Sequence, residues 1–187
     1  MANVITNILT INGTTEDVAK VREFIKGSNG ESISFQSFIK SPEELNGGLD
    51  RMMWKYMHWG TKWDADPVYD EAVDAPNRIT FNTKECAPIS AMRAISSNFP
   101  DVTLNLIFSD EYPGQYAGEY TLTGGAITNH AEYDAWGEST NDLSEDQVME
   151  CYFLTHEYDR ENWKKDEDGE WVSVSDDDIY DNDSVVE

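Results

Sequence analysis

The histidines and cysteines are the residues of this chain best suited to nucleophilic or metal chemistry, and they are scattered. His58, His130 and His156 form no HExxH motif, and neither they nor Cys86 and Cys151 fall at the spacing of metal ligands. Two cysteines cannot supply the four thiolates of an iron–sulfur cluster. The sequence therefore predicts no catalytic residue, no metal site and no cofactor.

Two weaker chemical signals also have structural interpretations. Cys86 lies near an expected helix start, whose dipole lowers a thiol pKa, but the neighbouring Glu85 opposes that effect. The run from Asp166 to Gly169 resembles the middle of an EF-hand loop. When that glycine is aligned with the loop, Lys164 and Ser175 occupy the first and last ligand positions, which require carboxylates. The run is therefore predicted to be the turn of a hairpin.

Charge is the most unusual property of the chain. It has 13 Lys and Arg against 37 Asp and Glu, a net charge of −24. Residues 1–100 carry ten basic and 13 acidic residues, net −3, whereas residues 101–187 carry three and 24, net −21. Phosphate contact needs clusters of basic residues, so direct binding to nucleic acid or to an anionic membrane is not expected.

An acidic surface of this size can imitate nucleic acid. Duplex DNA carries one phosphate per about 1.7 Å, so 21 charges would span about 36 Å, close to the width of about 40 Å of a compact chain of this length. We therefore expect the acidic half to bind a basic protein surface, although solubility alone also explains such charge. The predicted contacts are Asp110, Glu111, Glu157, Asp159, Glu161, Asp166, Glu167, Asp168, Asp176, Asp177 and Asp178.

Hydrophobic patterning predicts an α+β fold. Strands are expected at residues 3–12, 32–39, 78–83, 102–108 and 116–123, and helices at 14–27, 49–60 and 88–99. This order fits a βαββαβ antiparallel sheet with helices on one face, an extra strand and an insertion at about 40–77. The regular alternation stops after Gly125. Residues 126–187 are predicted to form an acidic extension with a short helix from Ser144, a hairpin around Asp168-Gly169 and a mobile tail from Ser175.

The inserted helix carries a methionine-rich stripe. Leu49, Met52, Met53, Tyr56 and Met57 recur at helical spacing. We interpret the stripe as the face that packs on the core. The alternative is a binding groove, because methionine side chains adapt to partners of varied shape.

Two tryptophans follow this helix in the run Trp59, Gly60, Thr61, Lys62 and Trp63. We interpret the run as an anchor that holds the inserted helix on the sheet. The alternative is a pocket in which both indoles stack on a base or on an aromatic side chain of a peptide.

Several segments resemble the YubB-type ferredoxin-like domain family of phages and mobile elements. The similar pieces are residues 1–27, SPEEL at 41–45, WGTKWDA at 59–65 and the stretch from 99 to 125. The chain departs from the family at 84–88, where a Trp-Ser-Pro-Pro phrase is usual and this chain reads KECAP. The resemblance implies a ferredoxin-like domain over residues 1–125 and a phage or mobile-element setting, and it implies no activity.

The sequence as a whole predicts a non-enzymatic accessory protein that binds a basic surface of a host nucleic-acid-handling defence complex as a DNA mimic. The alternatives are a small ligand-binding or hydrolytic domain that uses the Trp59–Trp63 pocket, and an acidic protein without an electrostatic partner. Few cysteines, no long apolar run and no basic N-terminal region predict a cytoplasmic protein without membrane association. The target and the oligomeric state stay open.

Overall fold

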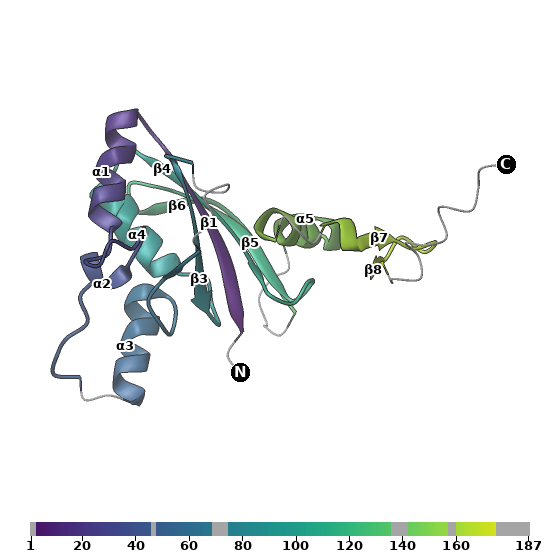
Figure 1. The fold of residues 1–187 in the computed structure, drawn as a ribbon, viewed down its shortest axis with the longest axis horizontal. Coiled ribbons are helices and arrows are strands. Elements are labelled where there is room, and N and C mark those ends of the chain that lie inside the picture. The colour runs from purple at the N-terminus through teal and green to yellow at the C-terminus, as the bar shows by residue number, and fades with distance from the viewer. Residues whose placement is uncertain (1–2, 46–47, 69–74, 136–141, 157–159, 175–187) are drawn as a thin grey trace. The chain divides into compact units, whose positions relative to one another are not determined.

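A six-stranded antiparallel sheet forms the centre of the larger part of the molecule. The computed structural model describes residues 3–45, 48–68, 75–135, 142–156 and 160–174, and the chain divides into two compact units, Met1–Thr155 and His156–Glu187. The sheet belongs to the first unit and has the strand order β2-β3-β1-β4-β5-β6. Its strands are β1 (Val4–Asn12), β2 (Asp66–Pro67), β3 (Arg78–Lys84), β4 (Thr103–Asp110), β5 (Tyr116–Thr123) and β6 (Ala126–Asp134) (Figure 1). The predicted α+β class is confirmed.

Helices cover both faces of this sheet, because α5 (Glu145–Thr155), from the segment predicted to be an extension, lies on the face opposite α1 (Thr15–Ile25) and α4 (Ile89–Asn98) (Figure 1). The other helices are α2 (Phe35–Phe38) and α3 (Leu49–Trp59). Figure 1 shows α1 and α4 on one side of the strands and α5 on the other. Ile107 and Ala117 point away from the main core, and α5 packs on β4 and β5 to cover them. Within the described ranges, none of the helices has the length and apolar character needed to cross a bilayer.

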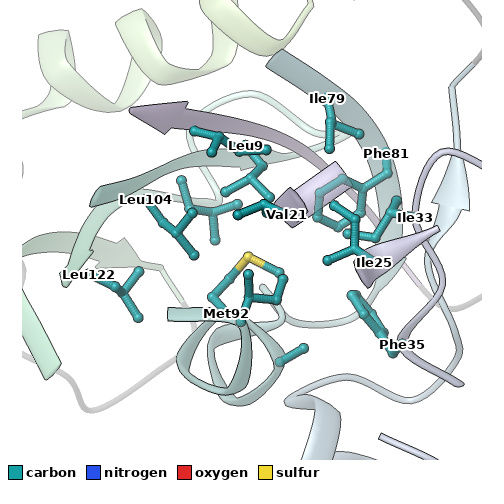
Figure 2. Packing of buried hydrophobic residues seen from close by; sticks show 14 of the residues in the cluster. Leu9, Val21, Ile25, Ile33, Phe35, Ile79, Phe81, Met92, Leu104 and Leu122 are labelled. Carbon is teal, nitrogen blue, oxygen red and sulfur yellow. The ribbon is translucent and has the colours of Figure 1, made fainter. Parts of the chain in front are cut away.

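The main core lies between the sheet and the first helix layer. Figure 2 shows strand residues directed toward α1 and α4; Leu9, Phe81, Leu104 and Leu122 meet Val21, Ile25 and Met92. All seven of these side chains are fully buried. Because burial of such a side chain contributes about 1.5–3 kcal/mol, this layer holds the order of the strands in place.

Two helices begin with a side-chain cap. Thr14 Oγ1 accepts a hydrogen bond from the backbone N–H of Asp17 at 3.2 Å, at the start of α1. At the start of α5, Ser144 Oγ accepts from the backbone N–H of Gln147 at 3.4 Å, and the Gln147 side chain accepts from the Ser144 N–H at 2.9 Å. Each bond satisfies an amide that the helix itself leaves unpaired.

The strand expected at residues 32–39 is wrong, because this segment contains the short helix α2. The carboxylate of Asp64 accepts hydrogen bonds from the Ser34 hydroxyl at 2.8 Å and from the backbone N–H groups of Phe35 at 2.5 Å and Gln36 at 3.4 Å. Amides that would pair with a neighbouring strand are thus taken by a side chain at a helix start. The edge beside β3 is instead the two-residue strand β2.

The boundary expected after Gly125 falls inside the first unit. Strand β6 pairs with β5 from Thr123 opposite Ala126 to Tyr116 opposite Asp134. Helix α5 then buries Val148 and Cys151 on the same sheet. The alternation of polar and apolar residues does not predict β6, because this edge strand exposes polar residues on both of its faces.

The second unit contains a small hairpin. The hairpin is formed by the paired strands β7 (Trp163–Lys165) and β8 (Trp171–Ser173), and the 3-10 helix η1 (Arg160–Asn162) precedes it. Gly169, with φ 88°, completes the turn between them. The hairpin predicted around Asp168-Gly169 is confirmed. The tail from Ser175, predicted to be mobile, lies outside the described residues.

Candidate functional site

The two tryptophans of residues 59–63 occupy different environments. Trp59 is 2% exposed, and its Nε1 donates to the backbone oxygen of Ile39 at 2.9 Å. Trp63 is 53% exposed, with Lys84 Nζ 5.7 Å from its ring centre. Because Trp59 is in the core, the two indoles cannot stack together on one ligand. The Trp59–Trp63 pocket expected under the alternative interpretation is therefore not formed.

Gly60 and Thr61 hold the end of α3 against the start of α4 and the end of β3. Gly60 ends the helix with φ 86°, and a Cβ at this position would lie only 3.0 Å from the backbone nitrogen of Ile89. Thr61 is fully buried; its hydroxyl donates to the Lys84 oxygen at 2.7 Å and accepts from the Lys84 N–H at 3.2 Å. These contacts support the interpretation of the run as an anchor.

Glu85 lies at the centre of a polar cluster beside this anchor. Its carboxylate accepts hydrogen bonds from the Tyr56 hydroxyl and, at 2.9 Å, from Lys62 Nζ. The bond from Tyr56 and then the bond from Lys62 lower the pKa of Glu85, whereas burial and then Glu85 itself raise the pKa of Tyr56. In the described part of the chain, Glu85 is the only non-glycine residue with a positive φ, 71°. Such a conformation is strained and persists where surrounding contacts hold it.

Neither thiol is activated. Burial, and then the charge of Glu85, raise the pKa of Cys86, and burial raises the pKa of Cys151 to about 11. A thiol with a raised pKa is protonated at neutral pH and is a poor nucleophile. Among the residues that the structure describes, no group of three or more His, Cys, Asp or Glu side chains could hold a metal ion.

The acids predicted at the end of β4 have structural partners. Asp110 is 3% exposed and accepts hydrogen bonds from Asn3 Nδ2 at 2.9 Å and from the Tyr112 N–H at 2.8 Å. Its prediction as a surface contact is wrong, because its carboxylate closes the turn that follows the strand. Glu111 is exposed, and its carboxylate accepts from the Val4 N–H at 2.9 Å.

The other predicted acids belong to the second unit. Asp166 Oδ1 accepts from the N–H groups of Asp168 at 3.0 Å and Glu170 at 2.9 Å, so this carboxylate shapes the hairpin turn. Glu167 and Asp168 are exposed in that turn, and Glu161 is exposed in η1. The remaining predicted contacts fall outside the described residues; they are Glu157, Asp159, Asp176, Asp177 and Asp178.

The structure also brings together acids that the sequence analysis did not select. Glu119 on β5 and Glu150 on α5 both lie close enough to Cys151 to raise its pKa, so these carboxylates share one side of the sheet. We name these two carboxylates, together with the exposed acids at the start of α5, the α5 acidic face; its exposed members are Glu119, Glu145, Asp146 and Glu150. Its one signal in the sequence is that no Lys or Arg occurs between Arg93 and Arg160.

Helix α3 exposes most of its apolar stripe, so the expectation that the whole stripe packs on the core is wrong. The exposed fractions are 66% for Leu49, 51% for Met53 and 71% for Met57. The helix packs through its indoles instead: Trp59 is buried in the core, and Trp54 is partly buried against it. The stripe is therefore available to solvent.

Comparisons with known proteins give little guidance. No family model matches this chain, and no curated protein matches it. A similar solved structure is the crystal structure of protein api92 from Yersinia pseudotuberculosis, of the family model DUF1281, with 16% identity and a TM-score of 0.38. The match covers 55% of this chain and 40% of that one, which is less than half the length of api92. At this TM-score, the likeness carries no argument about fold or function.

Proposed function

We propose that this protein is a non-enzymatic accessory protein of phage or mobile-element type that binds a basic surface of a host nucleic-acid-handling complex and blocks nucleic-acid access. The observation that carries the proposal is the α5 acidic face. Its carboxylates stand on a helix and a strand that share one core, in a stretch without Lys or Arg. A surface that imitates phosphates needs charges in fixed geometry, which regular elements provide and a tail does not.

The proposal includes a ferredoxin-like relationship. Its support is the order β2-β3-β1-β4, which places the first strand between two later ones as in ferredoxin-like sheets, with α1 after β1 and α4 between β3 and β4. The resemblance to the YubB-type family supports the mobile-element setting. Proteins with ferredoxin-like folds have many unrelated activities, so the fold indicates no activity. The proposed function is therefore argued from the α5 acidic face.

Electrostatic steering gives the proposal a measurable signature. A net charge of −24 attracts a basic partner over long range. Steering weakens with salt because the Debye length shortens from about 10 Å at 0.1 M to about 3 Å at 1 M ionic strength. Association with the partner is therefore expected to slow steeply as salt rises.

The experiment compares two triple variants of equal charge. A complex captured from host lysate at low salt is purified, and its association rate is measured with the wild type, with Glu145→Gln/Asp146→Asn/Glu150→Gln, and with the control Glu23→Gln/Glu43→Gln/Glu44→Gln. The first variant should slow association about tenfold and the control by less than about twofold, because only the first set belongs to the α5 acidic face.

Competition supplies the second readout. Duplex DNA should displace the protein from the captured complex. Equal effects of the two triple variants would show that net charge, and not the α5 acidic face, guides binding. If duplex DNA and this protein bound the captured complex at the same time, that result would contradict the proposal that the protein imitates DNA.

A further inference from the structure

A pocket lies beside α1, at the end of β1. Its volume is about 760 Å³, and its walls are one side of α1, the last residues of β1 and the residues just before β3. The Ile11 N–H donates to the backbone oxygen of Asn77 at 2.8 Å, which joins two of these walls. Sites for small organic molecules typically have volumes of about 300–1,000 Å³, so this pocket has a suitable size. We name it the Arg22 pocket, after the one charged residue that lines it.

One side of α1 forms a continuous wall of the Arg22 pocket. The wall residues are Thr15, Val18, Ala19 and Arg22. Their spacing of i, i+3, i+4 and i+7 places them on one face of the helix. Val18 is buried in the main core, whereas Thr15 and Ala19 are exposed, so the wall reaches from the core to solvent. A ligand in this pocket can therefore contact apolar surface and still be reached from solvent.

Arg22 lacks a polar partner in the part of the chain that the structure describes. Its Nη1 is buried and has no hydrogen-bond partner, and none of the ion pairs found there involves its guanidinium. A buried N–H group without an acceptor is unfavourable, and the chain has 37 carboxylate side chains that could have supplied one. The unpaired guanidinium is therefore the feature of the pocket that points to an anionic ligand.

The carboxylates near this part of α1 do not pair with Arg22. Glu23 and Glu31 line a second hollow, of about 420 Å³, which Arg22 also borders. Within the described ranges, neither acid forms an ion pair with Arg22. Glu31 accepts hydrogen bonds from the N–H and from Nδ2 of Asn29, both at 3.0 Å. Asp17 accepts from the hydroxyl of the N-cap residue of α1 at 2.6 Å. An anion from outside the chain would thus be the ion-pair partner that Arg22 lacks.

We propose that the Arg22 pocket binds a small organic monocarboxylate with an apolar body. The carboxylate pairs with the guanidinium of Arg22, because the planar array of N–H groups matches the two carboxylate oxygens. The apolar body covers Ile11, Val18 and Ala19 and removes their surface from water. This combination of an apolar lining with a few polar groups is typical of sites that bind small molecules.

A ligand with several negative charges fits this pocket less well. One cation neutralises one charge, and the net charge of −24 opposes further anionic groups. A phosphate ester is therefore disfavoured, and nucleic acid would need a cluster of basic residues. The inference is independent of the proposed function, because it concerns another helix and a ligand whose charge is opposite to that of the proposed partner.

The probes are three naphthalene compounds that differ in their polar group: naphthylacetate, the neutral amide of the same acid, and naphthyl phosphate. Their binding to the full chain is followed by two-dimensional amide NMR at neutral pH. The carboxylate probe should shift the amide signals of Gly13, Thr15 and Ala19 in a saturable way, with a Kd of about 1 mM or lower. The neutral amide and the phosphate should bind at least about tenfold more weakly.

Two pairs of variants test the guanidinium and the space beside it. Arg22→Gln should weaken binding of the carboxylate probe about tenfold, whereas Arg93→Gln, at an exposed position of α4 and with the same change in net charge, should alter it less than about twofold. Ala19→Leu puts a larger side chain at the pocket wall and should also weaken binding about tenfold, whereas Ala19→Ser keeps the space and should bind like the wild type. The spectrum of each variant also shows whether it is folded.

Four results would overturn the inference. They are no shift of these amide signals at about 10 mM carboxylate probe, equal binding of the carboxylate and its neutral amide, tighter binding of the phosphate than of the carboxylate, and equal effects of Arg22→Gln and Arg93→Gln. The triple variant of the α5 acidic face should bind the carboxylate probe unchanged, so this inference and the proposed function fail separately.

Discussion

The Tyr56 hydroxyl donates a hydrogen bond to the carboxylate of Glu85, a residue whose backbone has φ 71°. The contact joins α3 to the segment between β3 and α4, and Lys62 adds an ion pair to the same carboxylate. Side-chain contacts therefore accompany the strained backbone at the point where the chain leaves the sheet. Through these two contacts, Glu85 links α3 and the residues just after it to the segment that follows β3.

Two substitutions separate backbone strain from side-chain contacts at Glu85. Glu85→Ala removes both polar contacts and keeps a Cβ at positive φ, whereas Glu85→Gly removes the same contacts and relieves the strain. Glu85→Ala should therefore have a free energy of unfolding about 1 kcal/mol lower than that of Glu85→Gly, measured by urea denaturation. Equal stabilities would show that the positive φ costs nothing.

The Glu85 contacts should also make stability depend on pH. Because hydrogen bonds lower the pKa of Glu85 below its ordinary 4.5, folding favours the ionised carboxylate. This stabilisation is present above pH 4.5 and is lost as pH falls through the lowered pKa. The difference in free energy of unfolding between wild type and Glu85→Gln, measured in urea at a series of pH values, should be constant near neutrality and shrink below pH 4.5. A difference that stays constant into acid would contradict the assignment.

Trp59 and Trp63 form a matched pair for testing the anchor. Trp59→Phe leaves a cavity in the core and an unpaired oxygen on Ile39, so it should lower the free energy of unfolding by about 2–3 kcal/mol. Trp63→Phe changes an exposed ring and should cost less than about 0.5 kcal/mol. Chemical denaturation followed by circular dichroism measures both. Similar losses at the two positions would reject the division between core and surface.

Truncation tests the extent of the first unit. A fragment that ends at Thr155 keeps the six strands and α5, and it should melt cooperatively. A fragment that ends at Gly125 loses β6 and α5 and uncovers Ile107 and Ala117, so it should lack a cooperative transition. Calorimetry measures whether each fragment unfolds in a cooperative transition. A cooperative transition of the shorter fragment would support the domain boundary predicted after Gly125.

The thiols should resist modification in the folded protein. Because burial raises the pKa of both Cys86 and Cys151, iodoacetamide at about pH 8 should label them slowly in the native state and rapidly in urea. Mass spectrometry of the time course measures each site. Rapid labelling of Cys86 in the native protein would show that its thiol is activated and would contradict the assignment of a non-catalytic cysteine.

Local patterns were enough to predict much of the fold. The caps at Thr14 and Ser144 depend on a residue three positions away, and the hairpin depends on a glycine inside its own turn. The strands of the main core alternate clearly because one of their faces is fully buried. Such signals act over a few residues, so the sequence alone determined the α+β class, α1, α4, α5 and the β7–β8 hairpin.

Contacts between distant segments decided the rest. The pattern of residues 32–39 is typical of a strand, but the carboxylate of Asp64, 30 positions from Ser34, accepts hydrogen bonds there and stabilises the start of a helix. The carboxylate of Asp110 is buried and accepts a hydrogen bond from Asn3, which is 107 positions away in the chain. Whether the stripe on α3 is covered, and which acids gather beside α5, depends on how helices and strands pack. The spacing of apolar residues predicts which residues share one face of a helix or strand. It does not predict which other element packs on that face, and only the tertiary structure determines this.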